Sequence, residues 1–353
     1  MKVLASNADN GGCGFYRVIA PVTVLKHSGL DVVLDPEAST IKVVRDSNKR
    51  IVDIEPLDVD VVVLQRPLFA DSNELIPILQ SKGIAVVVEI DDDFWSVDTR
   101  HQGFEAWLPK TSPEFNYDFL TSSCKSADLV TVSTPSLARM VPNDNTVVIR
   151  NCAPGFYLEA QADRGDGWDW FEGHTVVGWT GNPGTHAGDL EVMGDALRRA
   201  VLASNARFLA IGDELTTKIC GFEDGESAWS PWVDLKNYPQ AVKALDVGIV
   251  PLRRSTFNEC KSYLKGLEYA ALGVAFVATP TSEYRMLNSF GVGDLAEYRH
   301  DWYKKLKRVI VNEKYRAEMV ERGIEFAKAH TYEKQAWRWA EAWEKALTIR
   351  RGK

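Results

Sequence analysis

The sequence predicts an α/β protein made of two Rossmann-like, doubly wound domains. A chain of 353 residues exceeds what one hydrophobic core usually holds, so two domains are expected. Runs of β-branched residues recur through the first half, as in parallel strands that are buried on both faces. Segments with helical spacing separate these runs, and strands and helices alternate again in the second half.

The first domain is expected at residues 1–155. A short strand opens the chain, a glycine-rich turn follows at 10–14, and the spacing of apolar residues predicts a helix that ends at Gly29. The expected strands are 1–6, 59–67, 84–93, 127–134 and 145–151, and the expected helices are 15–29, 72–82 and 135–140.

The second domain is expected at residues 174–325, after an irregular linker at 156–173. Its first strand runs into another glycine turn, and we expect Thr185 or Asp189 to cap the following helix. The expected strands are 174–184, 206–212, 247–250 and 274–278, and the expected helices are 185–202 and 235–245. Tryptophans at helical intervals in the last segment, 326–353, predict a helix with an apolar packing face.

The most informative segment lies between Asp246 and Pro280, where a strand, a polar loop, a helix and a second strand form one βαβ unit. Lys261, Lys265 and Glu268 follow at intervals of four and three, so a helix would place them on one face. Lysines near a helix start suit phosphate oxygens, and a carboxylate can accept two hydrogen bonds from a ribose diol. The same spacing also fits a solvated face with Lys–Glu pairs, and both interpretations stay open.

Residues 267–279 read LEYAALGVAFVAT and resemble the LE-x-x-A-x-G-x-P-V-V-A segment of GT-B glycosyltransferases, in particular the retaining family 4 (group 1) of bacterial or phage type. The resemblance implies two Rossmann-like domains facing a cleft, with the C-terminal helix, 326–353, crossing back to the first domain. It also implies that Glu268 binds the ribose hydroxyls of a nucleoside diphosphate sugar. Lys261 or Lys265 would then face the diphosphate.

The paired glutamates of that family, separated by seven residues, are only partly reproduced. Counting back from Glu268 places Cys260 at the first position, with Glu259 beside it. The resemblance assigns to donor binding Glu259, Ser262, Lys265 and Glu268.

The glycine turn near the N-terminus is a second candidate element of the donor site. Gly12 and Gly14 let the backbone approach a ligand closely, and the start of the following helix attracts negative charge. The turn lacks the dinucleotide fingerprint G-x-G-x-x-G, so a purely structural turn is the alternative. In GT-B enzymes this loop touches the donor phosphates or the acceptor, which makes Arg17, just inside the helix, a candidate anion contact.

The glycine turn that opens the second domain departs from the family pattern. Gly181 and Asn182 are assigned to donor binding, but the family's Arg is missing and His186 stands at the position of its Lys. Either His186 and the backbone of this turn replace the two cations, or Arg253 and Arg254 provide them. His186 could equally be a polar residue at a helix start without a ligand.

An acidic run, Glu89 to Asp93, ends a predicted buried strand, where open α/β sheets place ligands. Asp91 or Asp92 is expected to order the acceptor or the cleft loop. A divalent metal site and a solvent-exposed strand end are the alternatives. His101 is a further candidate on the acceptor side, and the resemblance gives as the catalytic set Lys261, His186, His101 and Asp91, with no metal ligand.

The composition of the chain makes several classes of function less favoured. A net charge of −8 and a pI near 5.4 make a broad nucleic-acid surface less favoured. No apolar run approaches the roughly 20 residues of a membrane span, and no signal peptide is evident, so we expect a cytoplasmic protein, in the host cytoplasm if phage-encoded. Five cysteines without C-x-x-C spacing predict neither disulfides nor a zinc site.

The resemblance implies a metal-independent, hexosyltransferase-type GT-B enzyme that transfers a sugar, with retention, from a nucleoside diphosphate sugar, and composition and length agree with it. The donor is the substrate, and no further cofactor is expected. The acceptor stays open between a glycan, a protein and a modified nucleobase. The alternatives are a nucleotide-sugar epimerase of the same fold and a non-catalytic nucleotide-sugar binding protein.

Overall fold

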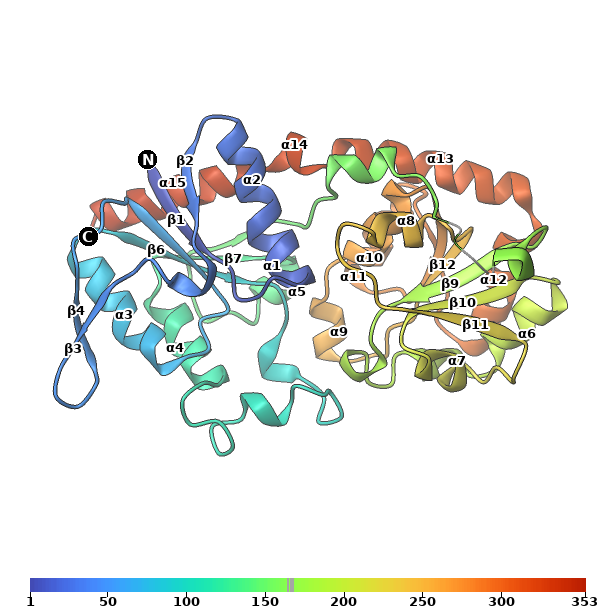
Figure 1. Cartoon of the computed structure of the whole chain (residues 1–353), viewed down its shortest axis with the longest axis horizontal. Coiled ribbons are helices and arrows are strands. Elements are labelled where there is room, and N and C mark those ends of the chain that lie inside the picture. Colours follow the sequence, from blue (N-terminus) through green and yellow to red (C-terminus); the bar gives the residue numbers. More distant parts are fainter. Residues whose placement is uncertain (164, 166–167) are drawn as a thin grey trace.

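The computed structural model describes residues 1–163, 165 and 168–353 and contains two six-stranded parallel sheets, which confirms the predicted fold class (Figure 1). The first sheet has the order β2-β1-β5-β6-β7-β8. Its strands are β1 (Lys2–Ser6), β2 (Asp31–Leu34), β5 (Val61–Gln65), β6 (Ala85–Ile90), β7 (Leu129–Val132) and β8 (Thr146–Val148).

Helices cover both faces of the first sheet. Alternate residues of β5 pack into two separate hydrophobic clusters, so every residue of this strand is buried. A π-helical turn, Phe15–Ile19, joins the first two helices, and a small antiparallel hairpin stands apart from the sheet. These elements are α1 (Gly12–Gly14), α2 (Ala20–His27), α3 (Ala70–Ser81), α4 (Tyr117–Ser126), α5 (Pro135–Ala138), β3 (Val43–Arg45) and β4 (Ile51–Ile54).

The second sheet has the order β11-β10-β9-β12-β13-β14. Its strands are β9 (Val176–Thr180), β10 (Arg207–Gly212), β11 (Ser227–Pro231), β12 (Val247–Val250), β13 (Ala275–Ala278) and β14 (Asp294–Leu295). Its helices are α6 (Ala196–Ala203), α7 (Leu215–Ile219), α8 (Tyr238–Val242), α9 (Thr256–Cys260), α10 (Leu264–Ala271), α11 (Ser282–Ser289) and α12 (Arg299–Val311). Short 3₁₀ turns elsewhere in the chain lie at Pro36–Ala38, Phe94–Ser96, Glu105–Trp107, Gly155–Glu159, Trp168–Phe171, Pro183–Thr185 and Leu190–Met193.

The C-terminal helices run along both domains (Figure 1). From the second domain α13 (Glu313–Ala329) leads through α14 (Tyr332–Gln335) to α15 (Trp337–Arg351), which contacts β5, β6 and β7 of the first sheet. Trp339 and Trp343 are buried in the same cluster as Tyr16, and this confirms the predicted crossing helix. Within the described ranges, none of the helices has the length and apolar character that crossing a bilayer requires.

Several local predictions are wrong or incomplete. The helix expected at 185–202 begins only at Ala196, because Gly188 and Gly194 take positive φ angles of 79° and 54° and break residues 183–195 into short turns. Thr185 and Asp189 therefore do not cap it. The short strand β11 was not predicted. Residues 164 and 166–167 of the expected linker lie outside the described residues. All five cysteines are free thiols, in agreement with the prediction that they form no disulfides.

Candidate active site

The two domains meet at the carboxyl ends of their parallel strands, where doubly wound sheets bind ligands. The second sheet reverses its strand order between β9 and β12, so the loops after these strands lie at its switch point. Across the domain boundary the amide of Gln102 donates to the carbonyl of Gly184 at 3.0 Å, and the His101 and Phe257 rings lie 6.0 Å apart. The candidate active site is built from these facing loops and from α10.

Glu268 lies on α10 at the centre of a buried hydrogen-bond network that joins both domains. Its Oε1 accepts a hydrogen bond from the hydroxyl of Tyr16, and its Oε2 accepts one from Tyr238 at 3.0 Å. The hydroxyl of Tyr157 lies 2.7 Å from that of Tyr16. Burial raises the pKa of Glu268, although the charge of Lys265 acts in the opposite direction. Each carboxylate oxygen therefore already accepts one O–H donor.

Lys265 occupies the first turn of α10 and points toward the end of β9. Its Nζ donates to the carbonyl and, at 3.0 Å, to the Oγ1 of Thr180, and it lies 5.7 Å from the ring of Trp179. Burial lowers the pKa of Lys265, and Glu268 opposes this effect. The lysine and the glutamate thus place a cation and an anion side by side at the switch point.

Lys261 does not share a helix face with Lys265, as the spacing predicted. The backbone is extended at Lys261, with φ −63° and ψ 143°, because α9 ends one residue earlier and α10 begins three residues later. The Nζ of Lys261 lies 3.8 Å from Asp92 and 4.6 Å from the ring of Phe257. This lysine therefore faces the first domain across the boundary.

His186 and Asp189 fix the loop after β9. The Nδ1 of His186 lies 2.9 Å from Asp189, and its ring packs edge-on against Trp179 at 5.5 Å. Burial lowers the pKa of His186 despite this carboxylate. Asp189 also accepts hydrogen bonds from the amide of Arg253 at 2.8 Å and from Asn258 at 2.6 Å. Sequence reasoning considered Asp189 only as a helix cap and missed that it ties together the loops after β9 and β12.

The glycine turn after β9 is shaped by its own residues. Gly181 has a φ of 150° and packs on the ring of Trp179, and the side chain of Asn182 accepts from the amide of Gly184 at 2.8 Å. The nearby cation Arg253 forms an ion pair with Asp98 from the first domain. Arg254 forms an ion pair with Glu297.

The N-terminal glycine turn has one position that requires glycine. A Cβ at Gly14 would collide with the carbonyl of Asp9, whereas a Cβ at Gly12 would meet open space. The prediction that Arg17 contacts an anion in the cleft is wrong. Its buried guanidinium donates to Glu89 at 2.7 Å and to Asn151 at 2.8 Å, so it stabilises the interior of the first domain.

The acidic run after β6 does not form one cluster. Burial alone would raise the pKa of Asp91, but its ion pair with Arg66 holds the pKa below the ordinary value. Asp92 faces Lys261, and Asp93 accepts from the amide of Trp95 at 3.1 Å. Over the part of the chain that the structure describes, no group of three or more His, Cys, Asp or Glu side chains converges as metal ligands would.

His101 lies where the first domain touches the loop after β12. Its Nδ1 accepts from the amide of Gly103 at 3.0 Å, and its ring packs against Trp107 at 5.3 Å. Burial and the charge of Lys261 both lower the pKa of His101, so the imidazole is neutral at neutral pH. Since Nδ1 accepts a hydrogen bond, the proton of the neutral ring resides on Nε2.

Comparisons with solved structures identify the fold of this chain. Anabaena Alr3699/HepE in complex with UDP matches with a TM-score of 0.65 and 14% identity, covering 97% of this chain and 99% of that one. Its complex with UDP-glucose matches with a TM-score of 0.62 and 12% identity over 97% and 100%. The chain has the GT-B fold.

A third structure agrees with this assignment. WaaG, a glycosyltransferase involved in lipopolysaccharide biosynthesis, matches with a TM-score of 0.59 and 12% identity over 97% of this chain and 99% of that one. No protein-family profile and no curated protein sequence matches the chain. At this level of identity the likeness extends to the GT-B fold of both domains.

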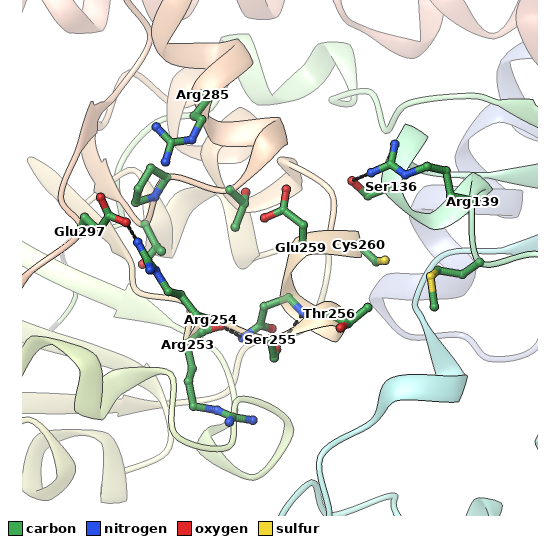
Figure 2. A pocket seen from close by; sticks show the side chains of 15 residues that line it. Ser136, Arg139, Arg253, Arg254, Ser255, Thr256, Glu259, Cys260, Arg285 and Glu297 are labelled. Carbon is green, nitrogen blue, oxygen red and sulfur yellow. Dashed lines mark hydrogen bonds and ion pairs between the residues drawn. The ribbon is translucent and has the colours of Figure 1, made fainter.

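The last two residues that were predicted to bind the donor, Ser262 and Glu259, both form hydrogen bonds with other residues of the protein. Ser262 accepts from Asn151 of the first domain at 2.8 Å. Glu259 accepts from the amide of Ser282 at 2.9 Å and lines a separate pocket, of which Glu268 is not a part (Figure 2). The structure therefore brings His186 and Lys265 together at the ring of Trp179, with Glu268 on the same helix as Lys265, and places Glu259 in a separate pocket.

Proposed function

We propose that this protein is a glycosyltransferase that moves a sugar from a nucleoside diphosphate sugar to an acceptor. The observation that carries the proposal is the pairing of Lys265 and Glu268 on the first two turns of α10, at the switch point of the second sheet. The GT-B fold supports it, because solved structures with this fold contain UDP and UDP-glucose.

In this proposal Glu268 binds the ribose diol of the donor. A diol supplies two O–H donors to one carboxylate, and in the structure Glu268 already accepts two O–H donors, from Tyr16 and Tyr238. Tyr16 belongs to the first domain, so separation of the domains releases Oε1. The ribose then replaces one or both tyrosine hydroxyls at the same oxygens.

The charge that develops on the leaving diphosphate requires cations and backbone N–H groups. Lys265 contacts the end of β9, Lys261 faces Asp92 of the first domain, and the turn at Gly181 follows β9, so all three belong to the segments at the switch point and the domain boundary. These groups supply positive charge, so our proposal includes no metal ion and no further cofactor. Closure of the domains excludes water and orients the acceptor, for which His101 and Asp91 are the first-domain candidates. Transfer of a hexose, retention and a cytoplasmic location belong to the same proposal.

A second candidate function is non-catalytic binding of a nucleotide sugar. Cys260 occupies the position of the first paired glutamate, and Glu259 hydrogen-bonds Ser282 instead of entering the cleft. A protein that binds the donor without turning it over would fit this arrangement. Only a measured product separates the two functions.

The test is thermal-shift screening against UDP-, GDP-, ADP- and TDP-sugars, followed by calorimetric affinity and nucleotide release with candidate acceptors. We expect one nucleotide to stabilise the protein. Glu268→Gln should weaken its binding by roughly tenfold, because the charge-assisted hydrogen bonds become neutral ones. The control is Glu283→Gln, which removes a buried carboxylate paired with Arg150 across the domains but leaves α10 intact. Equal losses in both variants would refute the ribose role, and binding without an acceptor-dependent product would favour the second candidate.

A further inference from the structure

A hollow, which we call the arginine pocket, is lined by residues of both domains (Figure 2). It has a volume of about 590 Å³, within the range of ligand sites. Its walls come from α5 of the first domain and from α9, α11 and the loops after β12 and β13. The pocket is named for the guanidinium groups that line it: Arg139, Arg253, Arg254 and Arg285.

Two of these arginines have no carboxylate partner in the described chain. Arg254 is paired with Glu297 and Arg253 with Asp98. Arg139 donates only to neutral oxygens, those of Pro135 and Ser136, and the side chain of Arg285 has no partner among the described residues. A guanidinium without a carboxylate suits a phosphate, which it can bind through two N–H groups.

The same pocket contains an acceptor for hydroxyl groups. Oε1 of Glu259 accepts from the amide and hydroxyl of Ser282, which leaves Oε2 without a partner among the described residues. In the view of Figure 2, Glu259 lies between Arg139 and Arg285. A purely anionic ligand would be repelled by this carboxylate, whereas a ligand that also carries sugar hydroxyls would hydrogen-bond to it.

The arginine pocket adjoins the domain boundary. A smaller hollow that contains His101 and Asp189 shares three wall residues with it, Arg253, Ser255 and Asn258. The arginine pocket therefore adjoins the hollow that contains the histidine that the proposed function places on the acceptor side.

We propose that the arginine pocket binds a phosphorylated sugar and that this group belongs to the acceptor. The guanidinium groups of Arg139 and Arg285, which have no carboxylate partner in the part of the chain that the structure describes, are the phosphate-binding groups, and Glu259 accepts the hydroxyls of the sugar. The assignment of this group to the acceptor rests on the proposed glycosyl transfer, whereas the binding of a phosphorylated sugar does not.

The experiment is calorimetric titration with glucose 6-phosphate as the probe, with the donor site saturated by the nucleotide that the screen identifies. Glucose, inorganic phosphate and glucuronate are titrated in parallel. We expect glucose 6-phosphate to bind more tightly than any of the three. Arg139→Ala/Arg285→Ala should weaken it by roughly tenfold or more, because each charge-assisted hydrogen bond contributes about that factor. Glu259→Gln should weaken glucose 6-phosphate but not inorganic phosphate.

The control is Arg199→Ala, an exposed arginine on α6 that pairs with Asp195 outside the pocket. Unchanged binding of the probe by the double arginine variant, or equal affinity for inorganic phosphate and for glucose 6-phosphate, would overturn the inference. The double variant should bind the nucleotide like the wild type. If the wild type binds the probe but no nucleotide, the pocket stands and the proposed function fails. If it binds nucleotide but not the probe, this inference fails and the proposed donor site is retained.

Discussion

Replacing Tyr16 with phenylalanine isolates the contact between the first domain and Glu268. The substitution removes one hydroxyl and leaves the aromatic ring packed in the core, since Tyr16 is only 3% exposed. It deletes the hydrogen bond to Oε1 of Glu268 and leaves the hydroxyl of Tyr157 without its 2.7 Å partner. Oε2 keeps its bond from Tyr238, so the change is confined to one oxygen of the carboxylate.

The expected effects on stability and on binding have opposite signs. A buried acceptor without its donor costs about 1–3 kcal/mol, so the melting temperature should fall by several degrees. If the ribose replaces Tyr16 at Oε1, the nucleotide complex does not lose this hydrogen bond, and only the free protein is destabilised. A difference of about 1.4 kcal/mol then tightens nucleotide binding roughly tenfold.

The assay is calorimetric titration of the stabilising nucleotide, with melting curves of the same samples. Tyr263→Phe is the matched control, because the buried hydroxyl of Tyr263 donates across the domains to the carbonyl of Asn151 at 3.1 Å and does not touch Glu268. We expect the control to melt earlier with unchanged nucleotide affinity. Equal or weaker nucleotide binding by Tyr16→Phe would show that Tyr16 does not compete with the ligand.

Three further predictions concern single side chains. Gly14→Ala should lower the melting temperature because its Cβ collides with the Asp9 carbonyl, whereas Gly12→Ala, where space is open, should not. Lys265→Met should weaken nucleotide binding by about tenfold, measured by calorimetry, and should also lower the melting temperature, because the Thr180 carbonyl loses its donor and Glu268 loses the neighbouring cation. The lowered pKa of His186 means that its contribution to stability is present above the unfolded pKa of about 6.5 and is lost as the pH falls from there through the lower pKa of the folded state. Melting curves of His186→Gln should therefore depend less on pH between about 7 and 5.

The elements that the sequence predicted well are those with strong periodicity or continuous apolar runs. The strand 247–250 is found as β12, and the helix before Gly273 is found as α10, because Gly273 takes a φ of 69° that ends it. The face shared by Lys261 and Lys265 was predicted wrongly. Spacing alone does not reveal that the chain straightens after α9, and this break is stabilised by a contact from Thr134, far away in the sequence.

The sequence could not predict the role of a residue when that role depends on partners far away in the chain. Arg17 follows a glycine turn, which favoured an anion contact, but its partner Glu89 lies on β6, 72 residues away in the sequence. The network around Glu268 was missed for the same reason, because Tyr16, Tyr157 and Tyr238 come from the first domain, the linker turn and the second domain. The cations of the arginine pocket likewise come from three separate segments, and of these the sequence singled out only Arg253 and Arg254, not Arg139 or Arg285.

The contacts between the domains differ in how strongly they oppose opening. Asp92–Lys261 and Asp98–Arg253 are partly exposed, and ion pairs of this kind contribute about 0–1 kcal/mol each because water replaces them. Glu268 is buried, so losing Tyr16 without a substitute costs more. A ligand that supplies hydroxyl donors to Glu268 removes that cost, whereas a bare diphosphate does not. Ribose recognition, rather than phosphate charge, is therefore the interaction that couples donor binding to the separation of Tyr16 from the second domain.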